Sequence, residues 1–89
     1  MSDAAIEALR EKIAEVDRAI VSLLNTRLEL VAELKGVKEA SGLAFVDLDR
    51  ERRLLEHLIE MNSGPLSDDG LQVLHRTILE VTKLELGKA

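Results

Sequence analysis

Two cations in one long helical stretch have the spacing to bind a small anion. Arg27 occupies a position where its neighbours in the pattern are Leu, Ile or Val, and a charge there is costly unless it is paired. Lys38 follows 11 residues later, within roughly 20° of the same direction and about 16 Å further along a helix. The two side chains could hold opposite ends of one ligand. Taken alone, Arg27 could instead form a buried ion pair or extend its charged end to solvent. Lys38 alone could be a solvated lysine near a helix end.

Arg10 and Glu51 extend this pattern. Arg10 lies roughly 25 Å before Arg27 along a helix, too far for both to bind one small ligand within one chain. In an antiparallel pair of long helices, the partner's Arg10 could approach Arg27; a surface arginine is the alternative. Glu51 precedes Leu55 and Leu58 at helical spacing, so we expect it on an apolar face. There it could accept a hydrogen bond from a ligand hydroxyl.

Other chemistry finds little support in the sequence. There is no Cys, and His57 and His75 lack a second residue at metal-ligand spacing, so we interpret both as surface or boundary residues. We interpret Arg52 and Arg53 as solvent-facing. The net charge of −5 argues against nucleic acid as the main partner. We expect no signal peptide and no membrane span, and therefore a cytoplasmic protein.

Breaks at Ser41-Gly42 and at Asn62–Pro65 divide the chain into three helical stretches, at about 4–40, 48–62 and 67–86. We expect a single all-α domain over residues 1–89. The first stretch carries a heptad seam of apolar residues, formed by Ile6, Leu9, Ile13, Val16, Ile20, Leu23, Leu30, Leu34 and Val37. A helix of this length measures roughly 55 Å, more than the two shorter helices can cover. It most naturally packs against a second copy, which predicts a homodimer.

The two shorter helices have recognisable starts and faces. Asp47 or Asp49 can cap the second helix, and Ser67 can cap the third. We expect the second to bury Leu54, Leu55, Leu58 and Ile59, and the third to bury Leu71, Leu74, Ile78 and Val81.

In this order and spacing, the motifs resemble those of the all-helical chorismate mutases, over nearly the whole chain. They are Ala8-Leu9-Arg10-Glu11-Lys12-Ile13, then Asp17, Leu24-Asn25-Thr26-Arg27, Lys38, and Asp47-Leu48-Asp49-Arg50-Glu51-Arg52. The stretch from Glu60 to Pro65 is similar to mutase domains fused to enzymes at the start of the shikimate pathway. The resemblance implies an intertwined homodimer of three-helix chains that converts chorismate to prephenate without a cofactor or metal, with a shikimate-pathway enzyme as a further candidate partner.

The resemblance also implies roles for individual residues. Lys38 would bind a carboxylate and the ether oxygen of the breaking bond, Arg27 would bind a carboxylate, and Arg10 of the partner subunit would complete each site. Asp47, through its backbone, and Glu51 would hold the ring hydroxyl.

Three further positions follow from the same resemblance. Arg50 would support the site, and Thr82 stands near the ring carboxylate, where the family often has Ser. Leu86 is a departure, because the family usually has there Gln, or a protonated acid, that donates to the ether oxygen. We therefore expect a slow mutase.

Three other functions remain open at this point. One is pyruvate elimination from isochorismate by the same fold. Another is a regulatory or docking domain that binds chorismate or prephenate with low activity. The third is a plain coiled-coil dimerisation module, against which the inward positions of Arg27, Lys38 and Glu51 count.

Overall fold

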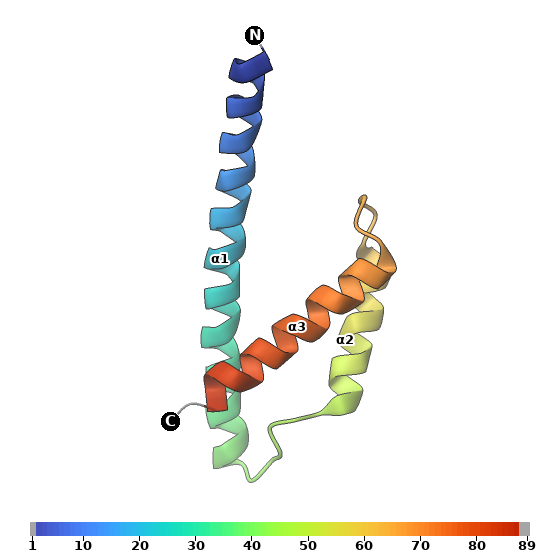
Figure 1. The fold of residues 1–89 in the computed structure, drawn as a ribbon. Helices are drawn as coiled ribbons and strands as arrows, with labels where there is room; N and C mark the ends of the chain where they lie inside the picture. Colours follow the sequence, from blue (N-terminus) through green and yellow to red (C-terminus); the bar gives the residue numbers. More distant parts are fainter. Residues whose placement is uncertain (1, 88–89) are drawn as a thin grey trace. The chain divides into compact units, whose positions relative to one another are not determined.

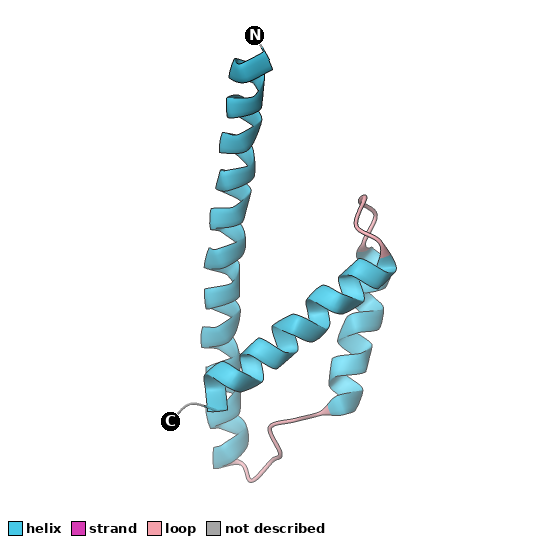
Figure 2. Ribbon diagram, in the orientation of Figure 1, coloured by secondary structure: helices cyan, strands magenta, loops and turns pink. Residues whose placement is uncertain are grey.

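The computed structural model describes residues 2–87, and in that range the chain forms three α-helices and no strand. They are α1 (Ser2–Ala40), α2 (Leu48–Met61) and α3 (Asp68–Gly87), joined by two loops (Figures 1 and 2). The prediction of one long and two shorter helices is confirmed. The chain divides into two compact units, of which one ends at Val31 and the other begins at Ala32, so that α1 runs through the boundary.

The end of α1 is fixed by a glycine turn. Gly42 has φ +72°, a left-handed conformation that side chains other than glycine rarely adopt. The amide of Leu43 donates to the carbonyl of Lys38 at 2.8 Å, and the amide of Gly42 donates to the carbonyl of Glu39 at 3.2 Å. This pair of bonds is the Schellman arrangement, which satisfies carbonyls that a helix end would leave unpaired. The turn therefore sets the direction in which the chain leaves Lys38.

Both shorter helices begin at the expected caps. The Asp47 carboxylate accepts a hydrogen bond from the amide of Arg50 at 3.1 Å. The Ser67 hydroxyl accepts one from the amide of Gly70 at 3.0 Å. Each bond satisfies an amide that the first turn of a helix cannot pair internally. Of the two aspartates that could cap α2, Asp47 does so.

Helices α2 and α3 contact each other. The residues predicted to be buried are confirmed on α2 but only in part on α3. On α2 all four expected residues are at least half-buried. On α3, Leu71 and Ile78 are half-buried, but Leu74 and Val81 are 52% and 43% exposed. The most buried residues of α3 are His75 and Thr82, each 5% exposed, so the interpretation of His75 as a surface or boundary residue was wrong. The prediction for α3 is confirmed for Leu71 and Ile78 and wrong for Leu74 and Val81, because polar residues occupy the centre of the buried face.

The seam of α1 is uncovered in the single chain. Its nine apolar side chains are between 44% and 68% exposed. Among the described residues, no apolar side chain is completely buried within the single chain. Apolar area of this extent on one helix face is typical of a surface that packs against another chain.

Candidate active site

Lys38 anchors the loop that follows α1. Its side chain is half-buried near the end of α1, and its Nζ donates to the backbone carbonyl of Phe45 at 3.1 Å. An ammonium group has three N–H donors, so this bond leaves two for a ligand. The bond holds the Lys38 ammonium beside the loop.

An open pocket of about 530 Å³ lies where α1, this loop and the start of α2 meet. Two residues expected in the site, Lys38 and Asp47, line it together. The full lining is Lys38, Leu43, Ala44, Val46, Asp47, Leu48 and Asp49. The two lining carboxylates have partners, since Asp47 accepts from the Arg50 amide and Asp49 pairs with Arg52. The remaining cation beside apolar walls can bind an anion that also carries an apolar ring.

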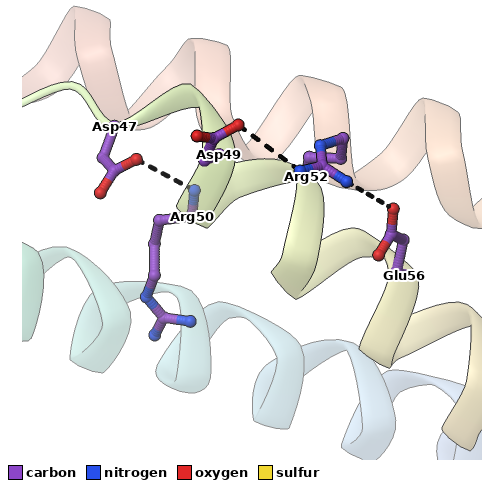
Figure 3. Close-up of polar contacts among 5 residues, drawn as sticks. All are labelled: Asp47, Asp49, Arg50, Arg52 and Glu56. Carbon is purple, nitrogen blue, oxygen red and sulfur yellow. Dashed lines mark hydrogen bonds and ion pairs between the residues drawn. The ribbon is translucent and has the colours of Figure 1, made fainter.

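The backbone at the start of α2 is held by Asp47 (Figure 3). Besides the side-chain cap, the carbonyl of Asp47 accepts from the amide of Glu51 at 3.1 Å. Arg52 bridges Asp49 at 3.5 Å and Glu56 at 3.1 Å, with its side chain 62% exposed, which confirms that it faces solvent. The Arg50 side chain points to the opposite side of α2 from Arg52 (Figure 3).

Glu51 lies on the side of α2 that contacts α3. Its side chain is 22% exposed, and Oε1 lies 3.2 Å from Nζ of Lys83. The inward position of Glu51 agrees with the sequence pattern. The partner was not anticipated, because an isolated lysine in the last helix gives no signal of its own; Lys83 is 45% exposed. The pair keeps a negative charge at this position without leaving it uncompensated.

Thr82 and Leu86 lie on the buried side of α3, as their spacing of four residues requires. Thr82 is 5% exposed, and its Oγ1 donates to the carbonyl of Ile78 at 2.6 Å. Leu86 is half-buried, whereas Glu85 is exposed. Leu86, and not Glu85, therefore occupies the inward position in the last turn.

Lys35 is a cation beside the loop of the pocket that sequence reasoning did not single out. Its Nζ donates to the backbone carbonyl of Leu86 at 2.9 Å and lies 5.6 Å from the centre of the Phe45 ring. No sequence signal marks Lys35, because it lies beside the seam and does not interrupt the apolar pattern.

Arg10 and Arg27 belong to the unit that ends at Val31. Arg10 is exposed and pairs with Glu7 at 2.9 Å, the side chains being 70% and 71% exposed. Arg27 is half-buried, whereas the apolar side chains of the seam are exposed. Both remain predicted site residues.

Within residues 2–87, no three His, Cys, Asp or Glu side chains are grouped so as to hold a metal ion. No helix in the described part of the chain combines the length and apolarity needed to cross a bilayer.

Comparison with known proteins identifies a matching family and several relatives. Residues 9–85 match the family model described as chorismate mutase type II. The chain is 34% identical over 85 residues to the bifunctional chorismate mutase/prephenate dehydratase of Stutzerimonas stutzeri, covering 89% of this chain and 23% of that protein. For the enzyme of the same name in Escherichia coli K12, the identity is 43% over 63 residues, 71% of this chain and 16% of the relative. The chain thus spans less than a quarter of these relatives' length.

Solved structures give the same result for the fold. Form I of a chorismate mutase from Thermus thermophilus superimposes with a TM-score of 0.84 at 34% identity, covering 86% of this chain and 96% of that one. Form II gives a TM-score of 0.88 at 31% identity, covering 93% and 94%. These proteins match this chain over nearly their whole length.

Proposed function

We propose that this chain rearranges chorismate to prephenate, because it belongs to the chorismate mutase type II family. The family match over residues 9–85 is the observation that carries the proposal. The pocket beside Lys38 supports it, because a half-buried ammonium that is hydrogen-bonded to the loop suits a dicarboxylate with an ether oxygen.

The proposed reaction is concerted and forms no covalent intermediate. Negative charge grows on the ether oxygen as its bond to the ring breaks. Lys38 would donate to that oxygen and to a carboxylate, and Arg27 would bind a carboxylate. Fixed cations stabilise the developing charge more than they stabilise the substrate, which lowers the barrier. Holding the flexible side chain of chorismate in its folded, reactive conformation supplies a further part of the acceleration.

The ring hydroxyl would be held at the start of α2. Glu51 would accept its hydrogen bond, and the backbone of Asp47 would add a contact. Arg50 would support this part of the site, and Thr82 would lie near the ring carboxylate.

The proposal includes a homodimer with shared sites. The exposed seam of α1 gives a second copy an apolar surface to cover. Arg10 of the partner subunit would complete each site. The single-domain organisation over residues 1–89, the cytoplasmic location and a shikimate-pathway enzyme as partner stay predictions.

The decisive experiment follows the absorbance of chorismate in the presence of purified protein and a metal chelator, and identifies the product. Formation of prephenate supports the proposal. Release of pyruvate from isochorismate in a parallel reaction, with chorismate left intact, would replace it with the lyase reaction.

A second function is favoured by Leu86. With an alkyl side chain at the inward position of α3, the site offers one donor fewer than the family pattern, which suits a low-activity domain that binds chorismate or prephenate and regulates another enzyme. Calorimetric binding of prephenate with no measurable turnover of chorismate would support this second function.

A further inference from the structure

Lys35 connects three separate segments of the unit that begins at Ala32. Its own backbone lies in α1, its Nζ donates to the carbonyl of Leu86 in the last turn of α3, and the same Nζ lies over the ring of Phe45 in the loop. Its side chain is half-buried. A lysine at an exposed helix position would keep its ammonium in water, so this placement needs a compensating interaction.

The two contacts of Lys35 provide that compensation. The last carbonyls of a helix have no partner within the helix and carry partial negative charge, which favours a cation. Leu86 lies in the last turn of α3, so its carbonyl is such an acceptor. The face of an aromatic ring attracts a cation as well. Lys35 thus fixes the end of α3 and the Phe45 ring with one charge.

Phe45 is held at a second point by Lys38. Lys35 contacts its ring and Lys38 contacts its carbonyl, at 3.1 Å. The residues on either side, Ala44 and Val46, line the pocket together with Lys38. A shift of Phe45 would therefore move both the pocket wall and the acceptor that orients Lys38.

We propose that Lys35 is a positioning residue of this site, which acts through Phe45 on the placement of the Lys38 ammonium. The inference rests on the proposed function for its catalytic consequence, but the contact itself can be tested without turnover. Lys35 does not need to touch the substrate. Through Phe45, Lys35 sets the position of the Lys38 ammonium.

The kinetic test compares three variants. Lys35→Met keeps the apolar stem and removes the charge; we expect kcat for chorismate to fall roughly tenfold while KM changes less than about threefold, as for a misplaced catalytic group. Lys35→Arg keeps a cation and a donor and should recover kcat to within about threefold of the unmodified chain. Lys12→Met, on an exposed part of α1, is the matched control and should leave both constants unchanged.

The second test uses Phe45 as a reporter. Phe45 is the only Phe of a protein without Trp or Tyr, so the phenylalanine near-ultraviolet CD band and the phenyl ring signals in NMR come from this ring alone. Lys35→Met should weaken the CD band and shift the ring signals, whereas Lys12→Met should leave both as they are. These readouts do not depend on chorismate turnover.

The outcomes separate the two proposals. If the unmodified chain does not convert chorismate, the proposed function fails, while the Phe45 signals still decide whether Lys35 holds the loop. Unchanged Phe45 signals in Lys35→Met overturn the positioning role. So does a variant with altered Phe45 signals but unchanged kcat, because Lys35 would then serve stability alone. Should Lys35→Met fail to fold, Phe45→Leu removes the ring contact and keeps the Lys38 acceptor; unchanged kcat in that variant also overturns the inference.

Discussion

Replacing Leu86 by Gln should raise the rate of the proposed mutase reaction. Leu86 is the half-buried residue of the last turn of α3, four residues after the buried Thr82, so a new amide there points to the buried side. The Lys35 bond to its carbonyl at 2.9 Å holds the backbone from which that amide extends. The side chain can thus place a donor without moving α3.

The expected gain is roughly tenfold in kcat, with little change in KM. A preorganised donor to a developing oxyanion typically contributes 10²–10³ in rate. The gain is reduced here because helix ends fray and α3 ends at Gly87, one residue further on. Tenfold corresponds to about 1.4 kcal/mol of transition-state stabilisation. KM should barely change, because the new bond strengthens mainly in the transition state.

The assay is steady-state loss of chorismate absorbance, with the oligomeric state checked by gel filtration. Leu84→Gln makes the same substitution at a side chain that is 67% exposed, and should leave kcat unchanged. If Leu86→Gln leaves kcat unchanged or lowers it while assembly is intact, the assignment of this position to the ether oxygen is wrong.

Three further predictions concern other parts of the site. Arg27→Ala should lower kcat/KM at least about a hundredfold, as expected for a lost charge contact, and undiminished activity would remove Arg27 from the site. Mixing inactive Arg10→Ala and Arg27→Ala dimers should restore activity, since some heterodimers keep one complete site; subunit exchange without recovery would refute shared sites. Asp47→Ala should lower the free energy of unfolding, measured with urea, by about 1 kcal/mol. Asp47→Ser should lower it much less, because serine also caps helices; an equal loss in the two variants would contradict the capping role of Asp47.

Much of the fold could be predicted from the sequence because its signals are local. Gly42, Asp47 and Ser67 each act on the helix end next to them, so the residues at each break are enough to predict where a helix ends or begins. The face of α2 is continuous in its apolar residues and was predicted correctly. The family, too, is recognisable, because its motifs keep their order and spacing along the chain.

The face of α3 and the partners of the site could not be predicted in this way. Periodicity counts apolar residues, and the centre of the buried face of α3 is occupied by His75 and Thr82. The contacts of Lys35 with Leu86 and of Lys83 with Glu51 join residues far apart in sequence. Neither lysine interrupts an apolar pattern, and so neither differs in sequence from a lysine in solvent. Such pairs depend on how helices meet, which local signals do not specify.

The burial pattern in the last turns of α1 bears on both the proposed dimer and the proposed site. The apolar Leu34 and Val37 are 48% and 64% exposed, whereas Lys35 and Lys38, on the adjacent face, are half-buried against the loop and α3. A helix that served only a single-chain core would bury the two apolar residues and expose the two lysines, because burying apolar area is favourable and burying charge is costly. A second copy that covers the apolar face would remove the cost of its exposure. An anion bound beside the lysines would reduce the cost of burying their charge. The inverted pattern is therefore what the proposed site requires of its central helix, and it favours a dimeric binding site over a plain coiled coil.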